Sequence, residues 1–215
     1  VITWSGEDGL SGIASYETAL GTSAGADNVV PWTALSDPGT ETKMLMDLGL
    51  NNGTSYYASV RATDVAGNVS EIASGDGILV DLTAPVNGNV LDGHGIDEMY
   101  TSSPDTLLGS WTGFSDDISG IENFDYAIGT SAYGTEIVEW TSIGKDTTLF
   151  VETGLPLIDA EQYFTSVRAV DYAGNISDLS ASNGIILDLT DMALVSSSVS
   201  PVSYLPLVEP PTLSY

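Results

Sequence analysis

Hydrophobic and polar positions alternate most clearly in two short stretches of the chain, residues 56–62 and 163–169. Each stretch places Tyr, Val and Ala on one face of an extended segment and an Arg on the other, since side chains alternate across a β-strand. Each runs into the sequence Asp-x-Ala-Gly-Asn, in which Gly-Asn suits a tight turn. The pattern therefore predicts the same β-hairpin twice.

The rest of the chain repeats with nearly the same spacing. Trp4 and Trp111 are 107 residues apart (111 − 4), and so are Asp64 and Asp171 (171 − 64). Gly, Ser and Thr are frequent and helix-favouring runs are missing, which is an all-β composition. A unit of about 100 residues with short strands fits a β-sandwich of immunoglobulin type, whereas a much shorter period would indicate a solenoid.

Short strands are predicted in both copies, separated by segments rich in Gly, Pro, Asn and Asp. In the first copy they are residues 1–4, 13–20, 29–32, 43–48, 56–62, 69–72 and 77–82. The second copy opens with a predicted strand at 86–91, an acidic loop at 92–104 and a further strand at 106–111. The predicted domains are 1–83 and 84–190, and 191–215 is a linker or the first strand of a further domain.

The two copies begin differently. The second has about 20 residues before its Trp and the first has three, so we expect the first domain to lack its first strand. Either the chain is a piece that begins inside that domain, or a neighbouring chain supplies the strand by β-augmentation. Residues 202–208, which read VSYLPLV, are a candidate for such a donated strand.

A set of residues at matched positions carries a resemblance to a known family. In the second copy these are Trp111, Tyr163, Val167–Asp171, Gly174, Asn175 and Asp188–Thr190, and in the first they are Trp4, Tyr56, Val60–Asp64, Gly67, Asn68 and Asp81–Pro85. Each copy resembles a fibronectin type III module of the kind repeated in large bacterial surface and secreted proteins. Over residues 1–190, the resemblance implies two tandem seven-stranded immunoglobulin-like β-sandwiches, the first lacking its first strand.

The charge balance is strongly acidic, with 30 Asp and Glu against 4 Lys and Arg and a net charge of −26. This argues against nucleic acid and anionic membrane surfaces as partners. It favours solubility, divalent-cation binding or a salty medium. The chain has no Cys and no long apolar run, so we expect neither disulfides nor membrane insertion. The resemblance implies an extracellular or bacterial cell-surface location.

Catalytic residues are not evident. The single His, His94, has no partner pattern around it, and without Cys there is neither a triad nor a Cys–His pair. We therefore predict a non-enzyme. Four aromatic residues are expected to have structural roles in the interiors of the two sandwiches: Trp4, Trp111, Tyr56 and Tyr163.

The basic residues of the hairpins are interpreted as structural. Arg61 and Arg168 are equivalent, as are Glu17 and Asp125 on the strand that neighbours the hairpin in this fold. We predict cross-strand pairs of Arg61 with Glu17 and of Arg168 with Asp125, each contributing about 0.2–1 kcal/mol.

Two acidic groups are candidates for Ca²⁺, the one cofactor that the pattern suggests. The first combines the loop before the third strand with the hairpin turn, and its members are Asp8 and Asp64 in one copy and Asp116, Asp117 and Asp171 in the other. The alternative is that these Asp side chains cap their own turns. The second group lies at the domain boundary and comprises Asp81, Asp92, Asp97 and Glu98, with a solvated linker as its alternative.

Three functions remain open. The first is a structural or adhesive segment of a long secreted or cell-surface protein, whose partners are other domains of the same chain, another protein or a surface glycan. The second is an accessory or carbohydrate-binding module of a secreted enzyme, with Trp32, Trp140, Tyr133 and Tyr172 as candidates for sugar stacking. The third is a fibre subunit that assembles by strand exchange.

Overall fold

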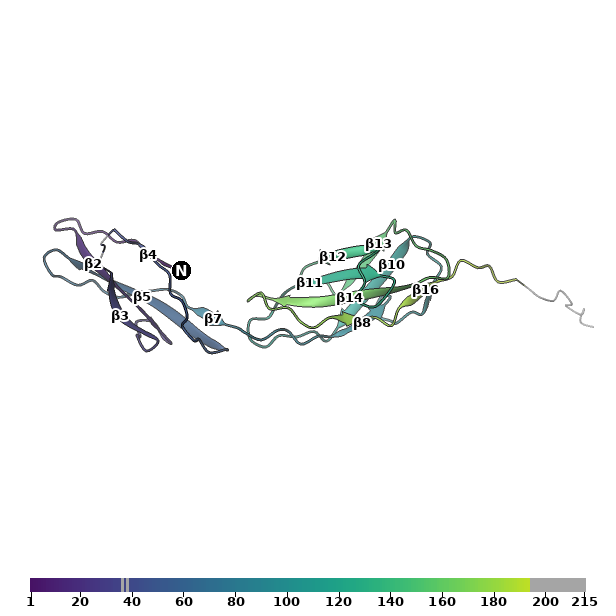
Figure 1. The fold of residues 1–215 in the computed structure, drawn as a ribbon, viewed down its shortest axis with the longest axis horizontal. Helices are drawn as coiled ribbons and strands as arrows, with labels where there is room; N and C mark the ends of the chain where they lie inside the picture. Colours follow the sequence, from purple (N-terminus) through teal and green to yellow (C-terminus); the bar gives the residue numbers. More distant parts are fainter. Residues whose placement is uncertain (36, 38, 194–215) are drawn as a thin grey trace, which may run out of the picture.

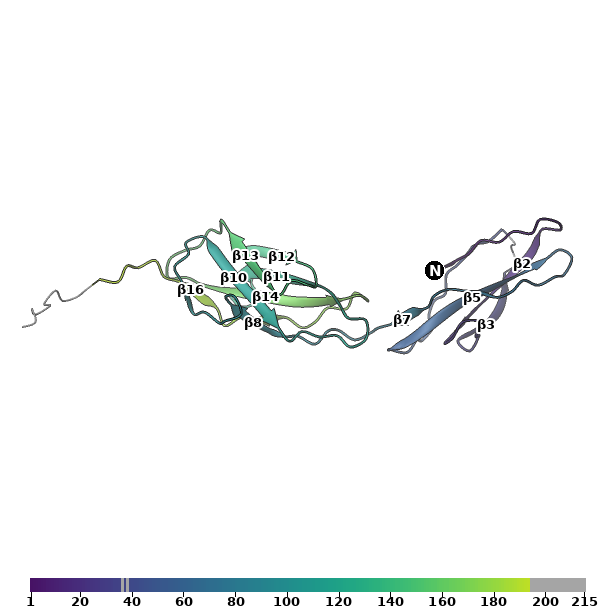
Figure 2. The same ribbon diagram turned by 180° about the vertical axis from the view of Figure 1, so that it is seen from behind.

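Two β-sheet units lie end to end along the long axis of the molecule (Figures 1 and 2). The structure is a computed structural model that describes residues 1–35, 37 and 39–193. All regular elements of this part are strands, so the predicted all-β fold class is confirmed. No helix among these residues has the length and apolarity needed to cross a membrane. The strand predicted at 202–208 lies outside the described residues.

The first unit consists of two small sheets. Its larger sheet has the order β3-β2-β5-β6, and β7 also pairs with β5. The smaller sheet joins β1 to β4. The strands are β1 (Ile2–Thr3), β2 (Ile13–Gly21), β3 (Val30–Leu35), β4 (Thr42–Lys43), β5 (Thr54–Asp64), β6 (Ala73–Ser74) and β7 (Ile78–Val80).

The second unit repeats this plan and adds two strands at its beginning. Its sheets have the orders β13-β10-β8 and β12-β11-β14-β16-β9, with β15 paired to β14. The added strands are β8 (Asn89–Asp92) and β9 (Tyr100–Thr101). The others are β10 (Thr106–Thr112), β11 (Ile121–Gly129), β12 (Val138–Ser142), β13 (Leu149–Thr153), β14 (Gln162–Asp171), β15 (Ser180–Ala181) and β16 (Ile185–Leu187).

The repeated hairpin strand is central in both units. β5 pairs antiparallel with β2, and β14 pairs antiparallel with β11, in matching registers. In the turns that follow, Gly67 has φ 92° and Gly174 has φ 89°, a region that disfavours side chains. At the other end of these strands, the Tyr56 hydroxyl accepts a hydrogen bond from Asn51 N and the Tyr163 hydroxyl accepts one from Ile158 N. The repeat in sequence is therefore a repeat in hydrogen bonding.

The hydrophobic core is much more extensive in the second unit. Trp111, Tyr163, Val167 and Leu187 are almost completely buried there, together with Phe124, Tyr126 and Phe150. In the first unit Tyr16 and Tyr56 are buried, but Trp4 remains half-buried. Burial of apolar area is the main source of stability, so the second unit contributes most of the stability of the chain.

The outer strands β3 and β12 occupy the same edge of their sheets. Pro31 lies within β3, and Glu139 takes the equivalent place in β12. Pro cannot donate a ladder hydrogen bond, so within a sheet it is tolerated on an edge strand such as β3.

Several strand predictions were wrong in detail. The strand predicted at 43–48 is reduced to Thr42–Lys43, and the left-handed φ of 54° at Asp47 turns the chain away from an extended course. The strand predicted at 69–72 lies instead at Ala73–Ser74. The acidic loop predicted at 92–104 contains β9, which pairs in parallel with β16.

Candidate functional site

The first part of the candidate site is the loop between β10 and β11. One carboxylate oxygen of Asp116 accepts hydrogen bonds from the backbone N–H groups of Ile118, Ser119 and Gly120, at 3.2, 2.9 and 2.6 Å. In the first unit, Asp8 accepts three bonds in the same pattern from Leu10, Ser11 and Gly12. The shared sequence Asp-x-x-Ser-Gly therefore builds one self-capped loop twice.

The second part is the hairpin turn after β14. Asp171 Oδ1 accepts hydrogen bonds from Ala173 N and Asn175 N, and its Oδ2 accepts one from Asn175 Nδ2 at 2.8 Å. Asp64 holds Asn68 in the same two-point manner, at 2.7 Å for both bonds. These contacts fix the position of both turns.

The third part comes from the end of the first unit. Asp81, just after β7, accepts hydrogen bonds at Oδ1 from the amide and hydroxyl of Thr83. Its Oδ2 accepts one from Ser119 N at 3.1 Å, and its carbonyl oxygen accepts one from Asn175 Nδ2 at 3.2 Å. The chain leaving the first unit is thus bonded to both loops of the second.

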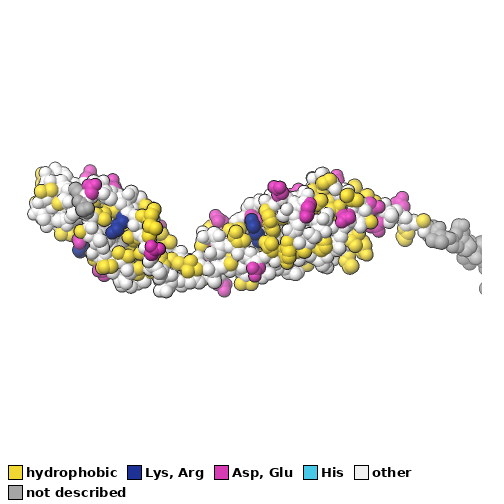
Figure 3. Space-filling model, viewed as in Figure 1, with side chains coloured by type: hydrophobic (Ala, Val, Ile, Leu, Met, Phe, Trp, Pro, Cys, Tyr) yellow, Lys and Arg dark blue, Asp and Glu magenta, His cyan; other side chains and the backbone are white. Residues whose placement is uncertain are grey.

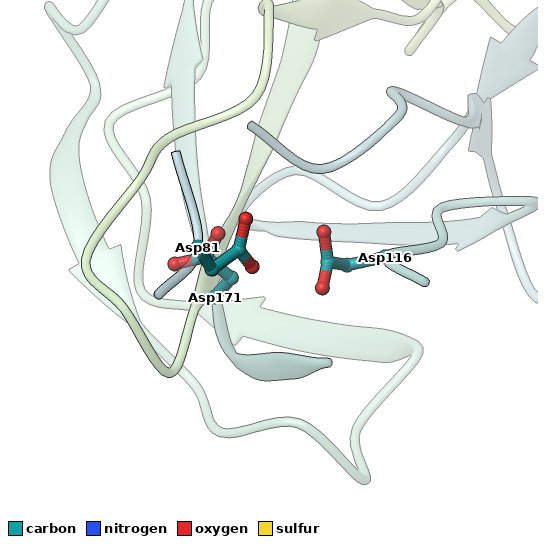
Figure 4. Close-up of side chains that lie close together, drawn as sticks. All are labelled: Asp81, Asp116 and Asp171. Atoms are coloured by element: carbon teal, nitrogen blue, oxygen red, sulfur yellow. The ribbon is translucent and has the colours of Figure 1, made fainter. Parts of the chain in front are cut away.

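Together these segments assemble three carboxylates at the joint between the units, as Figure 4 shows for Asp81, Asp116 and Asp171. Each offers one oxygen that lies within 4.8 Å of the other two. Asp81 and Asp171 are buried and Asp116 is half-buried. Carboxylate oxygens at such separations can ligate a hard divalent cation, although the N–H groups that they accept already compensate part of their charge.

Hydrogen bonding sets the protonation of several of these groups. The pKa of Asp81 is lowered, first by the nearby hydroxyl of Ser119 and then by the amide and hydroxyl of Thr83. The pKa of Asp8 is lowered by the amides of Gly12 and Ser11, and that of Asp64 by the side chain and amide of Asn68. Their carboxylate forms are therefore favoured at neutral pH.

The predicted metal groups are only partly brought together. Asp116 and Asp171 meet, but Asp117 is exposed and does not belong to the described cluster, which gains Asp81 instead. Asp8 and Asp64 occupy the equivalent loops of the first unit, where no described acidic residue takes the place of Asp81. The described cluster therefore differs in membership from the predicted sites within one domain, because its third carboxylate comes from the neighbouring unit.

The predicted second acidic group is dispersed. Asp92 is not at the joint, because its carboxylate accepts a hydrogen bond from Gly184 N beside the start of β14, whereas Asp171 ends that strand. Asp97 lies close to Asp92 and accepts a bond from Asn183, and both Asp97 and Glu98 are exposed. Only Asp81 of that group lies at the joint.

Asp92 is an unusual carboxyl group. It is 1% exposed, and its Oδ1 has no hydrogen-bond partner within the described structure. Burial raises its pKa to about 6, opposed by hydrogen bonds from Ser182 and Gly184. Such a group lowers the stability of the fold when it is ionised.

Both cross-strand pairs are present. Arg61 Nε lies 2.7 Å from Glu17 Oε2, and Arg168 Nε lies 3.0 Å from Asp125 Oδ2. Sequence reasoning missed a further contact: each guanidinium also lies over an indole ring, Arg61 over Trp32 and Arg168 over Trp140, at 4.6 Å from the ring centroid. The repetition of Arg and Trp at matched positions was the signal that could have revealed it.

These contacts bear on the predicted sugar-stacking residues. One face of Trp32 and one face of Trp140 are covered by arginine. Tyr133 and Tyr172 are more than half exposed, and Lys145 Nζ donates a hydrogen bond to the Tyr172 hydroxyl. Figure 3 shows that basic side chains are few and isolated on the visible face, among hydrophobic and acidic ones. The single His94 is exposed.

Comparison with curated proteins finds two enzymes that contain similar sequence. Exoglucanase B of Cellulomonas fimi is 33% identical over 181 residues, which cover 80% of this chain and 14% of that protein. Chitinase A1 of Niallia circulans is 32% identical over 139 residues, which cover 64% of this chain and 18% of that protein. The chain thus spans less than a fifth of either relative. No protein-family model matches it.

Among solved structures, the chain is similar to two sets of fibronectin modules. The FN1–FN3 domains of chicken CNTN1 are 16% identical with a TM-score of 0.44, over 81% of this chain and 56% of that one. The fibronectin(III)-like modules of Clostridium thermocellum CbhA are 13% identical with a TM-score of 0.40, over 84% and 81%.

Proposed function

We propose that the chain is a non-catalytic segment of a larger extracellular protein and acts as a spacer that holds other domains apart. The observation that carries the proposal is the bonded joint. Asp81 reaches both loops of the second unit, through Ser119 and Asn175, so the connection is more than a free linker. Other domains of the same long chain are its main partners.

A spacer of this kind should keep its two units in a defined orientation. Residual dipolar couplings and small-angle scattering of the chain measure that orientation. We expect the two units to tumble as one body in the wild type, and Asp81→Ala to release them. The Asp188→Ala variant, which removes the equivalent side chain away from the joint, is the matched control. Independent tumbling of the units in the wild type would contradict a spacer with a fixed joint.

The relatives favour a second role, as an accessory module of a secreted glycan-degrading enzyme. One relative is named an exoglucanase and the other a chitinase, and both extend far beyond the matched region. The spacer role predicts no retention of the chain on cellulose or chitin. Retention that is lost in Trp140→Ala would instead assign sugar binding to the exposed side of that ring. Surface adhesion and strand-exchanged fibres were the other expectations, and both require a partner surface.

Calcium binding at the joint is a separate proposal, supported by the three converging carboxylates. We expect Ca²⁺ to raise the melting temperature of the chain and a chelator to reverse the effect. Asp116→Asn should abolish the response, whereas Asp117→Asn, next to it and exposed, should not. If neither Ca²⁺ nor the chelator changes the melting temperature or the orientation of the units, this site is ruled out and the spacer role remains intact.

A further inference from the structure

Residues 92–101 form a strap across the end of the second unit that lies away from the joint. β8 ends at Asp92 and pairs with β10, and β9 pairs in parallel with β16 of the other sheet. Between these strands the strap turns over Ser110, whose hydroxyl donates a hydrogen bond to Gly93 O and accepts one from Gly95 N. The strap therefore connects the two sheets of the sandwich.

The strap also anchors β16. Ile186 N donates a hydrogen bond to Met99 O at 3.0 Å, and Asp188 N donates one to Thr101 O at 2.9 Å. The strap adds little apolar burial to this contact, since Met99 is 62% exposed and Tyr100 is 60% exposed. A segment that is held mainly by a few backbone hydrogen bonds can open while the core stays folded. The strap is therefore suited to local opening.

Two carboxylates join the strap to the turn before β16. Asp92 Oδ2 accepts a hydrogen bond from Gly184 N at 2.9 Å, and Asp97 Oδ2 accepts one from Asn183 Nδ2 at 2.8 Å. Asp92 is 1% exposed, and its Oδ1 has no hydrogen-bond partner among the described residues. A buried carboxylate with an unpaired oxygen opposes the closed arrangement, whereas the neutral carboxyl group opposes it much less.

The elements packed against Asp92 bring hydroxyl groups but no positive charge. The side chains of Thr165 in β14 and of Ser182 lie near its carboxyl group. β10 places Gly109 opposite it, and neither β10 nor β15 has a titratable side chain. The basic residue of β14, Arg168, is engaged in its cross-strand pair. Nothing in these elements therefore compensates an ionised Asp92 beyond hydrogen bonding.

The strap itself adds negative charge near Asp92. Burial raises the pKa of Asp92 to about 6, and the charge of Asp97 adds to this effect. The other titratable groups of the strap, His94, Glu98 and Tyr100, are exposed. A proton on Asp92 therefore removes the charge that the closed strap would otherwise bury.

We infer that Asp92 is a pH-dependent latch for the strap: residues 92–101 stay closed on β16 while Asp92 carries a proton and open locally when it is ionised. The closed strap holds this proton more tightly than the open strap, in which the pKa of Asp92 returns toward its ordinary value of 3.8. Closing is therefore fully supported below pH 3.8, and the support is lost as the pH rises through about 6. The inference goes beyond the spacer role, because it concerns how firmly β16 is held away from the joint.

The test is amide hydrogen exchange of the full chain from pH 4 to pH 7, expressed as protection factors, which remove the intrinsic pH dependence of exchange. We expect the amides of Ile186 and Asp188 to be less protected than that of Ala169, which donates to Ser177 Oγ in the interior. Their protection should fall by about 100-fold between pH 4 and pH 7. Asp92→Asn should keep it at the acid level throughout, whereas Glu98→Gln, exposed on the same strap, should behave as the wild type.

Two results would overturn the inference. If the amides of Ile186 and Asp188 are as protected as that of Ala169 at pH 7, the strap opens only when the whole unit unfolds. If their protection has no pH dependence in the wild type, or keeps the same pH dependence in Asp92→Asn, Asp92 does not control the strap.

Discussion

The two units share strand order, hairpin registers and turn chemistry, yet they differ in how well they enclose their interiors. The difference is concentrated in one segment. In the second unit β8 covers the core between β10 and the hairpin strand, and Trp111 is 1% exposed. In the first unit no described strand takes that place and Trp4 is half-buried. The same local sequence therefore forms the same sheets with or without the closing strand, but not the same core.

The largest expected effect separates the two cores. Trp111→Ala should reduce the free energy of unfolding of the second unit by about 3–5 kcal/mol, the range for removing a large buried aromatic side chain. Trp4→Ala, at the equivalent position, should cost clearly less because that ring is already half in solvent. Urea unfolding followed by far-ultraviolet circular dichroism measures both. Equal losses would show that the first unit is closed in solution.

The next effect concerns the carboxyl group that β8 brings into the second unit. The pKa of Asp92 is raised to about 6 from an ordinary value of 3.8, so the folded state holds its proton more tightly than the unfolded state. The contribution of protonated Asp92 to the stability of the fold is therefore complete below pH 3.8 and is lost as the pH rises toward 6. Asp92→Asn should stabilise the second unit at pH 7 by roughly 2–3 kcal/mol and remove this loss.

Thermal unfolding from pH 4 to 7 checks this expectation, with the exposed Asp76→Asn as control. Asp8, Asp64 and Asp81 act in the opposite sense, since their lowered pKa values add stability that is present above pH 3.8 and lost in stronger acid. A wild-type profile without any decline between pH 4 and 6 would contradict the buried state of Asp92.

A smaller effect is expected at the joint. Asp81→Asn keeps the size of the side chain but removes its negative charge, so the bond from Ser119 N should weaken while both cores stay intact. We expect a change in the orientation of the units and only a slight change in either melting temperature. Amide exchange of Ser119 reports the bond directly. Unchanged exchange would mean that the contact is not formed in solution.

The smallest effect concerns the paired arginines. Arg168→Ala should cost about 1 kcal/mol, because it removes both the pair with Asp125 and the contact with Trp140. Arg61→Ala should reduce the free energy of unfolding by no more than Arg168→Ala does, since Glu17 is 28% exposed whereas Asp125 is 13% exposed. Chemical denaturation of the two variants compares them. A larger loss in the first unit would show that its arginine has a role other than this pair.

Local and repeated features were predictable from the sequence, and features that depend on docking were not. The register of β2 on β5 follows from alternation, so the pair of Glu17 and Arg61 could be predicted. The meeting of Asp81 with Asp116 depends on how one unit packs against the next, which no periodicity encodes. The burial of Asp92 was missed because its segment reads as an acidic loop, although β8 carries its side chain inward.

The edge strands β3 and β12 have a consequence for many copies held close together. Pro31 removes a ladder donor from one edge and Glu139 places a charge on the other, and both oppose edge-to-edge sheet pairing. With a net charge of −26, like-charge repulsion acts in the same direction. Many copies of this chain can therefore lie close together and still resist lateral aggregation into fibrils.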